Sequence, residues 1–170
     1  QRSAAWLGER GLGNARREAE WIFAEALGLT RMELYLQFER PLVEAEVARL
    51  RALVARRGRR EPLAYVLGWQ PFRDLRLRVG PGVLVPRPET EELVALVLAE
   101  LPPAAAVLDV GTGSGAIALA LKHARPDTAV TAVDCSPEAL AVARGNAEAL
   151  GLAVAFHQGD LATGLAGPYQ

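Results

Sequence analysis

Val107-Leu-Asp-Val-Gly-Thr-Gly-Ser-Gly115, followed directly by Ala116-Ile-Ala-Leu-Ala-Leu121, is the most informative segment of the chain. The apolar residues Val107, Leu108 and Val110 are what a strand buried on both faces requires. The glycines permit positive φ angles and let the backbone approach a ligand or a neighbouring helix closely. A helix that begins after them points its unpaired N–H groups into the turn. The segment therefore predicts a strand, a turn and a helix that hold the polar part of a nucleotide-like cofactor.

Two acids near the turn bear on the identity of that cofactor. Asp109 precedes the glycines, and an anion there disfavours a pyrophosphate but suits the ammonium and sulfonium groups of S-adenosylmethionine. Asp134 ends a second apolar run, residues 129–133, where a carboxylate can accept both ribose hydroxyls in either class of cofactor. The glycines also fit the degenerate dinucleotide fingerprint, whereas no Lys-Ser or Lys-Thr follows them, which excludes a Walker-type phosphate loop. We expect S-adenosylmethionine and keep two alternatives, NAD and a structural turn without a ligand.

The composition is that of an ordinary folded protein. Of 170 residues, 51% are hydrophobic and 23% charged, and the length allows one domain or two small ones. A formal net charge of −1 gives no electrostatic reason to expect binding to nucleic acid or membranes. The single cysteine, Cys135, fits a reducing cytoplasm, and His123 and His157 lack metal-ligand spacing. We therefore expect a cytoplasmic protein without a metal site, a signal peptide or a membrane span.

Residues 1–66 are expected to form a helical domain. Asn14 can cap a helix that stops at Gly28, and Thr30 can cap a shorter one. A third helix ends near Gly58 and has an apolar and a basic face. The basic face contains four arginines: Arg49, Arg51, Arg56 and Arg57. This arginine face is either a solvated surface or a docking surface for an acidic partner or for RNA phosphates.

Residues 67–85 change from helical spacing to alternation. Apolar residues alternate with arginines over residues 75–79, residues 69–73 are a plausible partner strand, and Gly80-Pro-Gly82 ends the hairpin. We expect a β-hairpin linker here, followed by a cofactor domain over residues 86–170. That domain opens with Pro86-Arg87-Pro88 and the N-terminus of a helix. This segment either binds a carboxylate, through Arg87 and the helix N-terminus, or only turns the chain.

The remaining residues alternate between helix and strand. A helix is expected to end near Ala124, a strand to span 129–133, a helix 137–150 and a strand 153–156. Such alternation predicts an α/β fold with a parallel, doubly wound sheet. Gly159-Asp160-Leu161 follows the third strand, at the edge where ligands bind in such sheets. Three strands make an incomplete sheet, so we expect a further C-terminal portion.

The sequence resembles the HemK-type glutamine methyltransferases that modify peptide-chain release factors. Three segments are the basis of the resemblance: Arg60-Glu-Pro-Leu-Ala-Tyr-Val-Leu-Gly68, Leu84-Val-Pro-Arg-Pro-Glu-Thr-Glu91 and Leu108-Asp-Val-Gly-Thr-Gly-Ser-Gly-Ala-Ile-Ala118. Asp134 and the pair Gly159-Asp160 follow at matching positions, so the resemblance covers nearly all of the chain. It implies a helical N-terminal bundle, a β-hairpin linker and a Rossmann-like class I methyltransferase sheet, incomplete in this chain.

The resemblance also implies an activity and a set of binding residues. The family transfers a methyl group from S-adenosylmethionine to the side-chain amide nitrogen of the glutamine in a Gly-Gly-Gln segment. The implied cofactor-binding residues are Asp109, Gly111, Thr112, Gly113, Ser114, Gly115, Asp134, Asp160 and Leu161. Arg87, Glu89 and Thr90 are further candidates on the cofactor or substrate side. The implied partner is a release factor, with no membrane and no direct nucleic-acid contact. Residues 1–66 are expected to be the substrate-docking domain, which would bind the release factor through the arginine face or a face beside it.

The sequence departs from the family pattern in two places. The Asn-Pro-Pro-Tyr signature, expected soon after the third strand, is not among these residues, and Leu161 stands where the family often has an aromatic residue. An amide nitrogen is a poor nucleophile because its lone pair is delocalised, so that signature acts by orienting the target amide. No catalytic residue is therefore named, and residues 1–170 alone are expected to bind cofactor weakly and not to turn over.

Other functions stay open at this point. A related methyltransferase could act on a glutamine of a ribosomal protein or on adenine in nucleic acid, because the same signature occurs in those enzymes. An NAD-dependent oxidoreductase is disfavoured by Asp109. A docking module without catalysis would use the nucleotide fold only as a scaffold.

Overall fold

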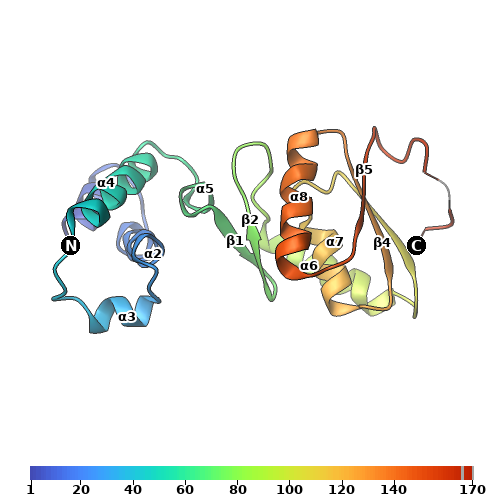
Figure 1. Cartoon of the computed structure of the whole chain (residues 1–170), viewed down its shortest axis with the longest axis horizontal. Helices are drawn as coiled ribbons and strands as arrows, with labels where there is room; N and C mark the ends of the chain where they lie inside the picture. The colour runs from blue at the N-terminus through green and yellow to red at the C-terminus, as the bar shows by residue number, and fades with distance from the viewer. Residues whose placement is uncertain (166, 170) are drawn as a thin grey trace. The chain divides into compact units, whose positions relative to one another are not determined.

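The computed structural model describes residues 1–165 and 167–169, and the chain forms two compact units. The first unit, Gln1–Gly68, contains only helices, and the second, Trp69–Gln170, combines helices with two small sheets (Figure 1). This arrangement of helices followed by a parallel sheet confirms the predicted α/β class.

The helices of the first unit begin and end mainly at local sequence signals. They are α1 (Arg2–Glu9), α2 (Ala15–Leu27), α3 (Arg31–Leu36), α4 (Glu44–Gly58) and α5 (Leu63–Leu67). Gly28 ends α2 with a φ of 65°, as predicted. Thr30 caps α3, because its hydroxyl accepts the Glu33 N–H and the Glu33 carboxylate accepts the Thr30 N–H. The side-chain cap predicted at Asn14 is wrong: only its carbonyl is used, and it accepts the Glu18 N–H.

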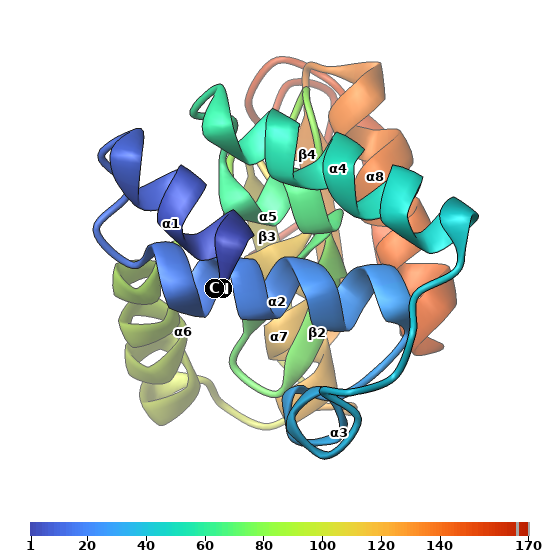
Figure 2. The ribbon, with the colours of Figure 1, turned by 90° about the vertical axis from the view of Figure 1, so that its left-hand side faces the viewer.

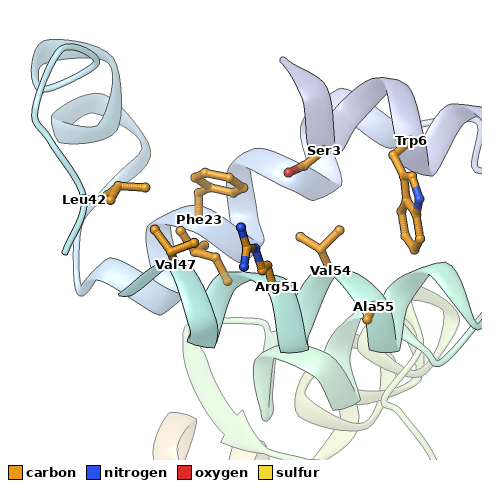
Figure 3. A pocket seen from close by; sticks show the side chains of 9 residues that line it. Ser3, Trp6, Phe23, Leu42, Val47, Arg51, Val54 and Ala55 are labelled. Carbon is orange, nitrogen blue, oxygen red and sulfur yellow. The ribbon is translucent and has the colours of Figure 1, made fainter. Parts of the chain in front are cut away.

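The core of the first unit lies where α1 and α4 pack on α2 (Figure 2). Leu7 and Ile22 are fully buried, and Trp6 packs against the cluster that contains Leu7. Gly58 allows this packing, because a Cβ there would collide with the Trp6 ring. A cleft of about 340 Å³ opens beside this core, with Phe23 among the side chains that line it (Figure 3).

The predicted arginine face does not form one continuous free surface. Arg57 donates from Nε and Nη2 to the Glu18 carboxylate at 2.6 and 3.1 Å, and both side chains are largely buried. Arg56 donates from Nε to Glu61 at 2.9 Å and from Nη2 to the Tyr65 carbonyl. These two arginines therefore join elements within the helical unit.

The second unit begins with a hairpin and continues as a series of alternating strands and helices. Its elements are β1 (Trp69–Phe72), β2 (Leu75–Arg78), α6 (Pro88–Glu100), β3 (Ala106–Val110), α7 (Ala116–Ala124), β4 (Ala129–Asp134), α8 (Pro137–Leu150) and β5 (Ala155–Gln158). β1 and β2 pair antiparallel, whereas β3, β4 and β5 form a parallel sheet in that order. Ser136 caps α8 as its spacing indicates, with the hydroxyl accepting the Ala139 N–H at 3.1 Å.

The hairpin packs inside the second unit. Phe72 and Leu77 are fully buried and belong to one apolar cluster with Val94 of α6 and Leu119 of α7. The compact unit therefore begins at Trp69, and the roles expected for residues 1–66, 67–85 and 86–170 stay predictions.

Two details of the sheet differ from the sequence-based expectation. Strand β5 lies two residues later than residues 153–156, because pairing with β4 places Gln158 beside Asp134 and both strands end together. Strand β3 is buried on one face only. Val107 joins the apolar cluster with α7, but Val110, on the opposite face, is 44% exposed.

Candidate cofactor site

The glycine turn between β3 and α7 is fixed by its backbone. Gly111, Gly113 and Gly115 have φ angles of 78°, 56° and 83°, which residues with a side chain rarely adopt. The N–H groups of Gly111 and Thr112 both donate to the Val133 carbonyl, at 2.8 and 2.9 Å. The turn is thereby attached to the end of β4, as the predicted strand–turn–helix unit requires.

The glycines of the turn have two different roles. A Cβ at Gly111 or Gly113 would meet no protein atom within 4 Å, so this part of the turn borders open space. A Cβ at Gly115 would lie 3.0 Å from Leu119 Cδ1 and 3.3 Å from the Cβ of Ala143. Gly111 and Gly113 therefore leave room for a ligand, whereas Gly115 permits α7 to pack against α8.

Asp109 is a buried carboxylate at the end of β3. Its Oδ2 accepts the Thr112 hydroxyl at 2.7 Å and the Ala118 N–H at 3.2 Å, so it caps the first turn of α7. Burial raises the pKa of the Asp109 carboxyl above its ordinary value, the two hydrogen bonds oppose this shift, and the Asp134 carboxylate adds to it. Because Oδ2 faces the protein, a direct contact between Asp109 and a cofactor stays a prediction.

Asp134 lies beside the turn at the end of β4. Its Oδ2 accepts the Gly113 N–H and its Oδ1 accepts the Ser136 N–H, each at 2.9 Å. Each carboxylate oxygen has more than one lone pair, so the group can still accept a ligand hydroxyl. Ribose binding by Asp134 stays a prediction.

The other predicted site residues occupy two places. The Gly159 N–H donates to the Asp134 carbonyl at 3.1 Å, so exposed Asp160 and Leu161 follow directly at the same edge of the sheet. Arg87, Glu89 and Thr90 lie at the N-terminus of α6, where Arg87 is the N-cap residue. Their approach to a cofactor stays a prediction.

Thr112 and Ser114 contribute backbone rather than side chains to the face of the turn. Both are buried, and the Thr112 hydroxyl is bonded to Asp109. If these two residues bind a cofactor, the contact uses their main-chain groups.

Sequence reasoning missed Asn146 of α8. It is buried, and its side chain reaches both the glycine turn and β2. The signal was present in the sequence: Asn146 lies three residues after Ala143 and four before Leu150, on the apolar face of the expected helix, where a polar amide needs a tertiary partner.

Among residues 1–165 and 167–169, no group of at least three His, Cys, Asp or Glu side chains could hold a metal ion. In the same part of the chain, no helix is long and apolar enough to cross a membrane.

Comparisons with known proteins agree with this geometry. The family model described as the PrmC N-terminal domain matches residues 1–68, and a methyltransferase domain model matches residues 107–168. A release factor glutamine methyltransferase of Geobacter sulfurreducens is 49% identical over 92% of this chain and 55% of its own length. The Salmonella typhimurium and Deinococcus radiodurans proteins of that name are 44% and 41% identical, over 86% and 98% of this chain. The chain spans 55–61% of the length of these three curated relatives.

Solved structures resemble only part of the chain. A ribosomal protein L11 methylase of Lactobacillus delbrueckii is 30% identical over 57% of this chain and 50% of its own, with a TM-score of 0.44.

Proposed function

We propose that the chain is part of a release factor glutamine methyltransferase and that it serves S-adenosylmethionine-dependent methylation of peptide-chain release factors. The acceptor is the side-chain amide nitrogen of the glutamine in their Gly-Gly-Gln segment. The main support is the combination of a family-specific N-terminal domain with an open glycine turn between two carboxylates.

The residues of the turn fit S-adenosylmethionine, which supplies an electrophilic methyl group on its sulfonium when bound. Gly111 and Gly113 leave open space beside the backbone, as close approach of a ligand requires. Asp134 would accept the ribose hydroxyls while it keeps the turn in place. Asp160 and Leu161 would border the adenine.

The electrostatics of the turn favour this cofactor over NAD. Asp109 and Asp134 both lie at strand ends beside the glycines, and negative charge there disfavours a pyrophosphate and attracts a sulfonium. No residue of this chain is proposed to act as a base. Transfer to an amide depends on orientation of the acceptor, and the residues described here supply the cofactor side of that arrangement.

The helical unit is proposed to dock the release factor in the cytoplasm. A single amide offers little area for discrimination among glutamines, so contacts away from the reacting group must supply it. Met32, Leu36 and Phe38, which we call the α3 patch, are 68%, 76% and 78% exposed. Met32 and Leu36 are about one turn apart on α3, and Phe38 follows two residues after Leu36. Exposed apolar side chains mark protein-binding surfaces, so we place the docking surface on the α3 patch.

Calorimetric titration of the full-length gene product with S-adenosylmethionine, and separately with NAD, tests the cofactor. Methyl transfer from labelled S-adenosylmethionine to an intact release factor, measured with the full-length gene product, tests the substrate. The control is a release factor in which the glutamine of Gly-Gly-Gln is replaced by alanine. Binding of NAD alone, or equal labelling of that control, would overturn the proposal.

A further inference from the structure

Asn146 connects three elements of the second unit through its side-chain amide. It lies within α8 and is 1% exposed. Its Oδ1 accepts the Arg78 N–H at 2.7 Å, and its Nδ2 donates to the carbonyls of Arg78 and Ser114 at 3.1 and 2.9 Å. All three partners are main-chain groups, one pair at the end of β2 and one in the glycine turn.

The two ends of this connection are structurally important. Arg78 is the last residue of β2 and lies opposite Trp69 in the hairpin. The Asn146 side-chain amide bonds to both the N–H and the carbonyl of Arg78, as the backbone of a neighbouring strand would. Ser114 precedes Gly115, which packs against Ala143 one helical turn before Asn146. The same face of α8 therefore contacts the turn through its packing and through a hydrogen bond.

Asn146 and Asp109 together complete the first turn of α7. In a regular helix the Ala118 N–H would donate to the carbonyl four residues earlier, that of Ser114. Here it donates to the Asp109 carboxylate instead. The Ser114 carbonyl accepts from Asn146. Side chains from β3 and from α8 thus satisfy two main-chain groups at the start of α7.

The burial of this amide requires an explanation beyond stability. A buried amide is costly unless it is hydrogen-bonded, and asparagine is a poor helix former. An apolar residue would fill the same space but would leave the main-chain groups of Arg78 and Ser114 without these partners. The asparagine is therefore suited to fixing the conformation of the turn relative to the hairpin.

We propose that Asn146 is a positioning residue for the cofactor: it holds the glycine turn in its binding conformation and couples that conformation to the β1–β2 hairpin. Asn146 touches no reacting atom and acts through Ser114 and Arg78. The inference rests on the proposed function only in that the ligand of the turn is S-adenosylmethionine. The coupling itself is a property of the unliganded protein.

The test compares Asn146→Ala with Leu150→Ala, a change about one turn further along α8 that also removes core packing. Alanine improves helix propensity at position 146, so any loss arises from the missing hydrogen bonds. The first readout is amide hydrogen exchange of Gly113, Gly115 and Arg78 without ligand. We expect exchange roughly 5- to 10-fold faster at all three in Asn146→Ala and unchanged in Leu150→Ala, since one hydrogen bond is worth about that factor.

The second readout is the Kd of S-adenosylmethionine, measured well below the unfolding temperature of each variant. We expect it to rise about tenfold in Asn146→Ala and to stay unchanged in Leu150→Ala. If both variants lower the Tm while exchange at Gly113 and Gly115 and the Kd are unaffected, Asn146 is only structural and the proposal is wrong. If Asn146→Ala does not fold, the same measurements use Asn146→Asp, which keeps the acceptor for the Arg78 N–H but loses the donor to the carbonyls of Arg78 and Ser114.

Asn146→Asp makes a further distinction. Arg78 should keep its protection from exchange in this variant, whereas Gly113 and Gly115 should lose theirs, and loss of protection at Arg78 alone would overturn the role in the turn. Should the wild-type protein bind no S-adenosylmethionine, the proposed function fails, and the exchange data alone still decide whether Asn146 fixes the turn.

Discussion

The Oδ2 atom of Asp134 accepts the N–H of Gly113 at 2.9 Å, so the carboxylate that we assign to ribose recognition also holds the glycine turn. Its Oδ1 accepts the Ser136 N–H, which joins the turn to the start of α8. Ligand recognition and loop geometry therefore depend on one side chain, and changes at Asp134 affect both.

Asp134→Ala should weaken S-adenosylmethionine binding by roughly 10- to 150-fold, because hydrogen bonds to a charged group contribute about 1.5–3 kcal/mol. Calorimetry measures the change. Glu148→Ala, which removes an exposed acid from α8, is the control and should leave the Kd unaltered. Unchanged affinity in Asp134→Ala would remove Asp134 from the site.

Substitutions of the glycines should separate ligand binding from packing. Gly115→Ala places a Cβ 3.0 Å from Leu119 at a φ of 83°, and should lower the free energy of unfolding by about 2 kcal/mol. Gly113→Val also strains the backbone, at a φ of 56°, but its side chain meets no protein atom. Beyond that strain it should chiefly weaken cofactor binding, because a branched side chain occupies the ligand's position. Urea unfolding and calorimetry on both variants are the measurements. The opposite ranking would contradict the two roles.

Asp109→Asn tests whether cofactor binding depends on the negative charge of Asp109 or only on its capping hydrogen bonds to α7. The amide oxygen can accept from Thr112 and Ala118 as Oδ2 does, so the cap should survive. Because burial raises the folded-state pKa of Asp109, the folded protein binds this proton more tightly than the unfolded chain. The contribution of Asp109 to stability is thus largest at low pH and is lost as the pH rises through its folded-state pKa.

Asp109→Asn should therefore remove this loss and be at least as stable as the wild type at pH 7, as thermal unfolding would show. Its affinity for S-adenosylmethionine should fall several-fold if the negative charge attracts the sulfonium. A variant that is markedly less stable at pH 7 would show that the charge itself holds the turn.

Local signals predict the elements well because their causes are local. Ser136 and Gly151 mark both ends of α8, and the apolar run over residues 129–133 predicts the strand that ends at Asp134. The missed features depend on distant partners. Asn146 bonds to Arg78, 68 residues earlier, and Arg57 pairs with Glu18, 39 residues earlier. The position of β5, two residues later than expected, also depends on a distant partner, because pairing with β4 determines which residues form the strand.

Glu20 should determine part of the acid sensitivity of the helical unit. Hydrogen bonds from Tyr35, Arg31 and Arg16 outweigh burial and lower the pKa of Glu20 to about 2. A lowered pKa means that the stabilisation is complete above the unfolded value of 4.5 and is lost as the pH falls toward 2. Glu20→Gln should be less stable than wild type at pH 6 and should lose less stability between pH 4.5 and 2. Circular dichroism during urea unfolding follows both, and parallel pH profiles would contradict the assignment.

Docking of the release factor should depend on the α3 patch and not on Arg57. Leu36→Ser combined with Phe38→Ser changes two side chains that are more than three-quarters exposed, so stability should be unaffected. Methylation of an intact release factor by the full-length gene product should lose roughly 10- to 100-fold in kcat/KM if these are interface anchors. Methylation of a short Gly-Gly-Gln peptide, which cannot reach the patch, should not change.

Arg57→Glu is the matched contrast: it breaks the largely buried pair with Glu18, should cost about 3 kcal/mol of stability, and should impair both substrates alike. If the double serine variant also impaired both substrates alike, or neither, the docking surface would lie elsewhere on the protein.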